Sequence, residues 1–236
     1  MAKINFKKGL TDIVLYIIIF IVVQIFLTYA GAGIWAAVKG EGYQATLFAM
    51  RTGNNAILTA LTTVFSNVIT LIIFLKAKWT PLTRNYLQSK PWISLLWVAL
   101  FTLGAIIPLE FVYEQIGVEM DADTERVFAS LMKEPWGYVA IGILAPLAEE
   151  IVFRGAILRT LLDMVSKKNH WVAIFISAAA FGLIHGNKAQ FINALLMGLL
   201  LGWMYYRTKS LVPGILMHWV NNTMAYVLNN LMPQSD

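Results

Sequence analysis

Residues 13–38 read IVLYIIIFIVVQIFLTYAGAGIWAAV, a stretch without a single Asp, Glu, Lys, Arg or His. About 20 apolar residues in a helix are enough to cross the hydrocarbon core of a bilayer, whereas the core of a secretory signal has only about 7–15. The stretch is preceded by Lys3, Lys7 and Lys8. It therefore predicts a transmembrane helix that is retained in the mature protein.

Six further apolar segments follow, so that the predicted spans are residues 13–38, 56–75, 92–113, 136–158, 171–186, 191–206 and 211–231. Of the 236 residues, 58% are hydrophobic and 13% are charged, whereas soluble domains carry about 25% charged residues. A bilayer tolerates no unpaired backbone groups, and the alternation typical of barrel strands is absent, so the segments predict helices. The predicted fold class is all-α, a polytopic transmembrane helical bundle of about seven spans. Residues 1–236 are expected to form a single integral membrane domain.

The connecting segments predict an orientation. Of the 18 Lys and Arg residues, 12 fall on the side of the N-terminus, five fall on the opposite side and Arg154 falls within a span. Because cytoplasmic loops are enriched in Lys and Arg, the N-terminus is expected in the cytoplasm. The net charge of +5 comes from short basic clusters between apolar runs, so no nucleic-acid partner is expected. Segment 40–55 is the most loop-like, and residues 123–133 favour a short interfacial helix.

Ionisable and amide side chains recur in the last spans, where a charge costs roughly 2.5–3.5 kcal/mol at a helix centre. They are Glu149, Glu150, Arg154, His185, His218 and Asn222. Glu150 and Arg154 are four residues apart, so they share a helix face and can pair. Glu149 points about 100° away from Glu150 and is free to face a cavity. His218 and Asn222 are also four residues apart and can present donors to one point.

Hydrolysis is the chemistry that this set allows. A carboxylate can act as general base on water, and a histidine with an amide can stabilise an oxyanion. Pro146, just before the acidic pair, can kink its helix and let water reach the carboxylate. Alternatively, Glu149, His185 and His218 could bind a divalent metal such as zinc, although the His-Glu-x-x-His pattern is absent. With no cysteine in the chain, thiolate chemistry is excluded.

Depth along the helices tests whether these groups meet. At about 1.5 Å per residue from the span ends on the N-terminal side, Glu149, His218 and Asn222 lie roughly 10–16 Å deep, and His185 lies about 21 Å deep. This count favours a site that opens to the cytoplasm, with His185 as the outlier. Two alternatives to catalysis stay open. Glu149 with His185 could relay protons in a transporter. His218 with Asn222 could serve merely to form hydrogen bonds between neighbouring helices.

Three motifs resemble those of the CPBP family, the CAAX proteases and bacteriocin-processing enzymes also called the Abi family. Glu149, Glu150 and Arg154 match Glu-Glu-x-x-x-Arg. Phe181 and His185 match Phe-x-x-x-His, and His218 and Asn222 match His-x-x-x-Asn. The motifs stand in the family's order and place the catalytic core in about residues 136–231.

The resemblance implies an intramembrane endopeptidase of the CAAX type. Glu149 would activate water with the help of His185, and His218 with Asn222 would form the oxyanion hole. Glu150, Arg154 and Phe181 would support the site. The family is catalogued as metallopeptidases, and some members are instead glutamate-dependent, so the cofactor stays open.

By the same resemblance, the expected setting is a bacterial plasma membrane, and the expected substrate is a peptide or small membrane protein. Two alternatives are kept: a non-proteolytic bacteriocin immunity or adaptor protein with this fold, and a proton-coupled transporter. Against the transporter, the two halves of the chain show no paired repeat.

Overall fold

The computed structural model describes residues 5–115, 117 and 120–231, and the regular structure in these ranges is helical throughout. The helices are α1 (Phe6–Lys39), α2 (Tyr43–Arg51), α3 (Ala56–Lys76), α4 (Asn85–Gln88), α5 (Trp92–Gln115), α6 (Ala122–Met132), α7 (Pro135–Gly137), η1 (Tyr138–Leu144), α8 (Ala145–Glu149), η2 (Glu150–Leu158), α9 (Arg159–Met164), η3 (Lys167–Asn169), α10 (His170–Leu183), α11 (Lys188–Thr208) and α12 (Val212–Leu231). The predicted all-α membrane bundle is confirmed.

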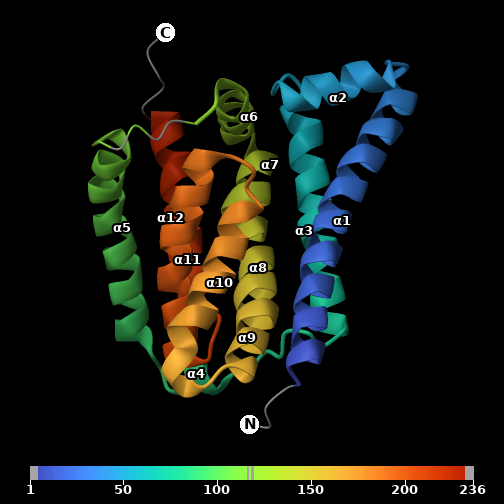
Figure 1. Ribbon diagram of the computed structural model, residues 1–236. Coiled ribbons are helices and arrows are strands. Elements are labelled where there is room, and N and C mark those ends of the chain that lie inside the picture. Colours follow the sequence, from blue (N-terminus) through green and yellow to red (C-terminus); the bar gives the residue numbers. More distant parts are fainter. Residues whose placement is uncertain (1–4, 116, 118–119, 232–236) are drawn as a thin grey trace.

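Long helical rods traverse the bundle in alternating directions, and α1 begins at the opposite end of the bundle from the one where α12 ends (Figure 1). Six rods are α1, α3, α5, α10, α11 and α12, and the seventh runs without a break from α7 through α9. By length and composition, α1, α3, residues 92–109 of α5, and α11 are the described helices able to cross a membrane. The rod from α7 to α9 is divided by π-helical segments, α10 is short and α12 carries polar residues.

Three short helices lie at the ends of the bundle, α2 and α6 at the C-terminal end and α4 at the N-terminal end (Figure 1). A helix predicted at 123–133 is confirmed as α6, whose first turn is capped by Asp121; its place in the membrane interface stays a prediction. The loop expected over residues 40–55 is wrong in part, because α2 forms there. Leu47 and Met50 of α2 are buried in a small cluster with Ala32 and Leu58, and this tertiary packing stabilises a helix that local hydropathy does not reveal.

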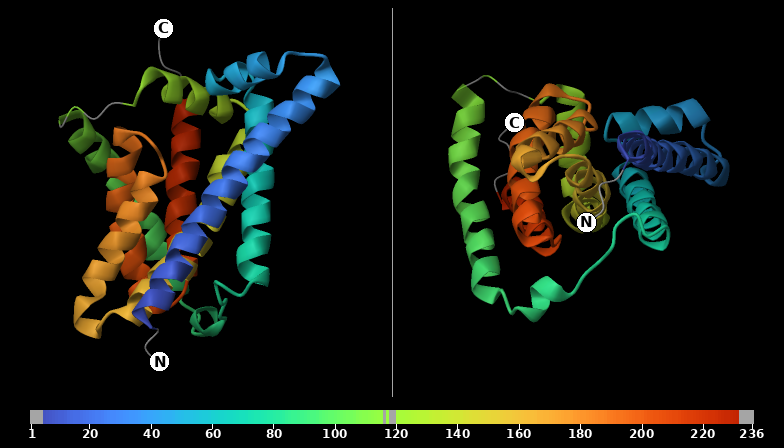
Figure 2. Two further views of the ribbon diagram at one scale, coloured as in Figure 1. Left: turned by 45° about the vertical axis from the view of Figure 1, so that its right-hand side comes forward. Right: turned by 60° about the horizontal axis from the view of Figure 1, so that its bottom comes forward.

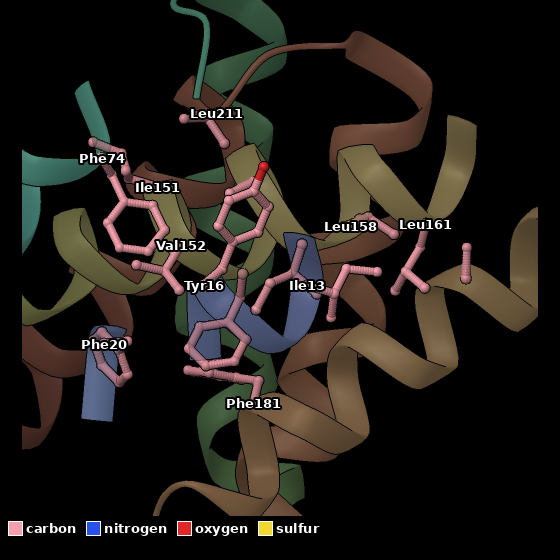
Figure 3. Packing of buried hydrophobic residues seen from close by; sticks show 14 of the residues in the cluster. Ile13, Tyr16, Phe20, Phe74, Ile151, Val152, Leu158, Leu161, Phe181 and Leu211 are labelled. Atoms are coloured by element: carbon pink, nitrogen blue, oxygen red, sulfur yellow. The ribbon is translucent and has the colours of Figure 1, made fainter. Parts of the chain in front are cut away.

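The rod from α7 to α9 forms the axis of the packing. All nine residues of η2 are buried, and Ile151, Val152 and Leu158 join residues of α1, α3 and α10 in the main hydrophobic core (Figure 3). By contrast, α5 stands at one edge of the bundle and α1 with α3 stand at the other (Figure 2). The side chains predicted to be functional thus lie on central elements, away from both edges.

Candidate active site

A distortion of the central rod creates the first anchor of the site. The N–H of Ala145 donates to the carbonyl of Ala140, five residues back, as in a π-helix. Pro146 has no N–H to offer, so the carbonyl of Ile141 has no partner within its own helix. The side-chain amide of Asn222 donates to that carbonyl at 2.8 Å. The carbonyl freed by the distortion is therefore satisfied by a side chain of α12, and this bond holds Asn222 near Glu149 and Glu150.

Glu150 and Arg154 form the predicted ion pair in the centre of the bundle. Arg154 Nη1 lies 2.9 Å from Glu150 Oε1, and each side chain is only 1% exposed. The guanidinium also lies over the ring of Phe181, 4.4 Å from its centroid, a cation–π contact that is favourable where water is absent. Phe181 therefore contacts the pair directly, as its supporting role requires.

Two glycines leave room for this pair. A Cβ atom on Gly214 of α12 would lie 2.7 Å from Glu150 Oε2. A Cβ atom on Gly198 of α11 would lie 2.9 Å from the Cβ of Ala178 and 3.2 Å from Arg154 Nη2. Small residues let helices approach closely, and here the close approach encloses the two charges.

His218 lies between the two glutamates. Its Nε2 is 3.5 Å from Glu149 Oε2, and its Nδ1 is 3.4 Å from Glu150 Oε1. The side chain of His218 is 6% exposed and that of Glu149 is 16% exposed. His218, and not His185, is therefore the histidine in contact with Glu149, and it links this carboxylate to the buried ion pair.

His185 lies two residues after Leu183, the last residue of α10, and its ring is held by the backbone of that helix. Its Nδ1 lies 2.9 Å from the carbonyl oxygen of Phe181. Since a carbonyl only accepts, Nδ1 carries the proton in this bond, and Nε2 of the neutral ring keeps a lone pair. The ring meets Phe181 edge to face at 5.0 Å. Gly186 then turns the chain with a φ of 74°, a conformation that glycine adopts without strain.

A cavity of about 300 Å³ brings the four predicted catalytic residues together. Its polar lining is Glu149, His185, Gln190, Asn193, His218, Asn221 and Asn222. Phe128 and Met132 of α6 also line it, and α6 lies at the C-terminal end of the bundle (Figure 1). His185 is thus no outlier, because α10 ends before it and the loop that follows borders the cavity.

The expected opening toward the side of the N-terminus is wrong. The cavity is bordered by α6 and by the first residues of α11, both at the opposite end of the bundle. The depth count failed because it treated every span as a straight helix with ends at the same level. Gln190 and Asn193 were missed because single amides near helix ends carry no distinguishing pattern. Asn221, the sequence neighbour of Asn222 and the alternative amide in the third motif, also lines the cavity. Asn193 accepts a hydrogen bond from the hydroxyl of Tyr113 in α5 at 2.9 Å.

The proposed metal ligands do not converge as a site. A catalytic zinc is held by three protein ligands, yet no group of three His, Cys, Asp or Glu side chains in the described ranges is arranged to hold a metal ion. Glu149 Oε2 and His218 Nε2 face each other, while His185 contacts Phe181 instead. The residues therefore do not fit a three-ligand zinc site in this conformation.

Comparison with known proteins adds independent evidence. Residues 131–224 match the family described as type II CAAX prenyl endopeptidase Rce1-like. This part of the chain is therefore similar to that family. All three motifs lie within residues 131–224, and both matches support the resemblance to the CPBP family that was inferred from the motifs.

The chain is also similar to a protein of Bacillus subtilis (strain 168) that is named "Putative membrane peptidase YdiL". The two are 26% identical over 126 residues, which is 51% of this chain and 50% of that protein. The matched region thus spans about half the length of the curated relative. No solved structure matches the chain.

Proposed function

We propose that this protein is an intramembrane endopeptidase that hydrolyses a peptide bond of a membrane-associated peptide or small protein, with water activated by Glu149. The observation that carries the proposal is the cavity inside the bundle, where Glu149 stands 3.5 Å from His218 and shares the lining with His185 and Asn222. The Rce1-like match supports a protease at the level of the family.

The reaction would begin with water in this cavity. Glu149 accepts a proton from the water, and the hydroxide formed attacks the scissile carbonyl carbon. His185 Nε2, whose ring is fixed through its Nδ1–H and the carbonyl of Phe181, accepts a hydrogen bond from the same water and orients it. When the tetrahedral intermediate collapses, the C–N bond breaks and the proton on Glu149 passes to the leaving nitrogen.

The oxyanion of that intermediate needs donors in a fixed position. His218 Nε2–H is one candidate, because its ring is held between the two glutamates. Asn222 is the other. One of its two N–H groups is used by the carbonyl of Ile141, which leaves the second to donate to substrate. The bond to Ile141 would preorganise the donor at no cost during the reaction.

The location of the cavity suggests how substrate enters. With the N-terminus in the cytoplasm, as the Lys and Arg distribution favours, the end of the bundle that carries α6 faces away from the cytoplasm. Phe128, Met132 and Met197 give the cavity an apolar wall, suited to a hydrophobic peptide segment. These features favour entry of the substrate from the half of the bilayer that faces away from the cytoplasm, and the proposed plasma-membrane location rests on the family resemblance.

Cleavage by protein reconstituted in vesicles tests the proposal. The probe is an internally quenched peptide with a farnesylated cysteine near its C-terminus, alongside the same peptide without the lipid. New peptide termini are also compared in membranes of cells that express the wild type or a variant. Glu149→Gln should abolish cleavage with normal membrane insertion, and Glu41→Gln, an exposed acid in the loop before α2, should cleave normally.

Cleavage that survives in Glu149→Gln would contradict the assigned base. If no peptide or native substrate is cut and the Glu149→Gln variant still protects cells from a bacteriocin, the non-proteolytic immunity protein is the correct reading. Cleavage of both peptides alike would show that a prenyl group is not part of what the enzyme recognises.

A further inference from the structure

A second cavity lies at the opposite end of the bundle from the catalytic one. It has a volume of about 950 Å³ and is formed where α9 ends, α10 begins and α11 ends. Figure 1 shows these ends together near α4, at the level of the N-terminus. A volume of this size is in the range of small-molecule sites, and the proposed hydrolysis makes no use of it.

The charge of this cavity is strongly positive. Arg159, Lys167, Arg207 and Lys209 line it, and Asp163 is the acidic residue in its lining. Arg159 is partly satisfied, since its Nη2 donates to the carbonyl of Trp79 at 2.9 Å and its Nη1 lies 3.9 Å from Asp163. Positive charge is therefore in excess in the cavity lining, carried by Lys167, Arg207 and Lys209.

An aromatic stack orders one wall. The imidazole of His170 lies parallel to the ring of Tyr206, with centroids 4.1 Å apart and an interplanar angle of 5°. Lys209 Nζ lies 4.5 Å from the centroid of the same tyrosine ring. Desolvation lowers the pKa of the Lys209 ammonium, while Asp163 raises it and Lys167 lowers it. A lysine held on an aromatic wall and short of counter-charge is prepared to meet an anion.

The backbone at Lys209 is unusual for its residue type. Lys209 ends α11 with a φ of 53°, in the left-handed region, where glycine or asparagine is the ordinary choice. Its N–H closes the helix by donating to the carbonyl of Tyr205 at 2.8 Å. The strained conformation turns the chain so that the lysine side chain contacts Tyr206 at the cavity wall.

We propose that this cavity binds the phosphate group of an anionic phospholipid headgroup. The basic side chains would contact the phosphate, while Leu162, Val165 and Pro81 in the lining would contact the adjoining apolar part of the lipid. The cavity lies at the ends of α9, α10 and α11, at the level of the N-terminus. With the N-terminus in the cytoplasm, as the Lys and Arg distribution favours, this is the cytoplasmic side, where basic pockets between membrane helices are typical sites for such headgroups. The proposal does not depend on the proposed protease activity.

The test uses the full chain in detergent micelles doped with phosphatidylglycerol, with phosphatidylcholine, or with phosphatidylcholine plus inorganic phosphate. Bound lipid is counted by native mass spectrometry, and the Tm is followed by tryptophan fluorescence. The variant is Lys167→Gln/Lys209→Asn, because asparagine accepts the left-handed conformation. Its matched control is Lys168→Gln/Lys90→Asn: Lys90 is also left-handed, with a φ of 50°, and both residues are at the same end of the bundle but outside the cavity lining.

Phosphatidylglycerol should bind the wild type and raise its Tm more than phosphatidylcholine does. Each lost charge should weaken binding by about fivefold, so the cavity variant should bind more than about tenfold less tightly while the control binds like the wild type. An equal loss of phosphatidylglycerol affinity in the control variant would show that only the total surface charge matters, and it would overturn the proposal. The same Tm rise with inorganic phosphate would show that a free anion, and not a lipid, is the ligand.

Discussion

Segment η2 and helix α5 are both composed mainly of apolar residues, but η2 is enclosed by protein and α5 is largely exposed. Every residue of η2 is buried, including Glu150 and Arg154. In α5, Trp92, Ile93 and Ile107 are more than half exposed, and Thr102 is a buried polar residue. In a membrane protein, apolar content therefore does not identify the interior, since lipid solvates apolar faces as well as protein does. The interior of this bundle is marked instead by its charged and polar side chains.

The largest effect that this comparison predicts is at Arg154. Arg154→Met leaves Glu150 as an uncompensated buried charge, and breaking such a pair costs about 3–5 kcal/mol. The folded fraction, measured by size-exclusion chromatography of the detergent extract, should fall strongly, whereas Arg51→Met, at an exposed site in α2, should be tolerated.

The double variant Glu150→Met/Arg154→Met separates pairing from chemistry. Because it removes both charges together, it should recover much of the lost yield while staying less active than the wild type. A normal yield of inactive Arg154→Met would contradict the supporting role and place Arg154 in the reaction itself.

Asn222→Ala comes next in size. It removes a proposed oxyanion donor, and the loss of one such donor costs about 10²–10³ in kcat. The bond to the carbonyl of Ile141 is lost as well, for about 1 kcal/mol of stability. Steady-state cleavage should show the loss in kcat and not in KM, with Asn85→Ala, at an exposed site in α4 outside the cavity lining, as the control. Unchanged kcat would leave Asn222 a purely structural residue.

A pair of glycine substitutions measures the difference in packing directly. Gly198→Ala would push a Cβ atom against Ala178 and Arg154, and such overpacking costs about 1–3 kcal/mol. Gly104→Ala in α5 would meet no atom within 4 Å, so it should be neutral or stabilising, since alanine favours a helix over glycine. Thermal unfolding of both variants in one detergent checks this. Equal destabilisation would mean that α5 is packed as closely as the core.

The smallest effect on stability is expected at the N-terminus of α6, the helix that borders the catalytic cavity. Asp121 accepts hydrogen bonds from the backbone N–H and the hydroxyl of Thr124, and these bonds lower the pKa of the Asp121 carboxyl. A lowered pKa means that the carboxylate stabilises the start of α6 above the ordinary pKa of aspartate. This stabilisation is lost as the pH falls through the lower value.

Hydrogen exchange of α6, expressed as protection factors, should therefore weaken in acid for the wild type. Asp121→Asn keeps a capping oxygen without the charge, so its protection should not depend on this titration. The same acid response in Asp121→Asn would assign the effect to another group.

The helices and the residues of the site could be predicted well from the sequence, whereas the geometry of the site could not. Runs such as 13–38 are long enough to predict a span by themselves, and the spacing of Glu150 and Arg154 predicts their pairing. The partner of the Ile141 carbonyl in η1 could not be predicted, because it is the amide of Asn222, 81 residues away on another helix. The contact of His218 with both glutamates and the basic cavity at the other end likewise depend on how separate helices pack.

The central claim is that Glu149 activates water inside the bundle without a resident metal ion. The most direct test is the metal content of purified, active protein, with peptide cleavage measured before and after chelation. The account predicts cleavage that survives chelation with far less than one metal ion per chain. Cleavage that is lost on chelation and restored by zinc, with about one ion per chain, would contradict it and make Glu149 and His218 ligands.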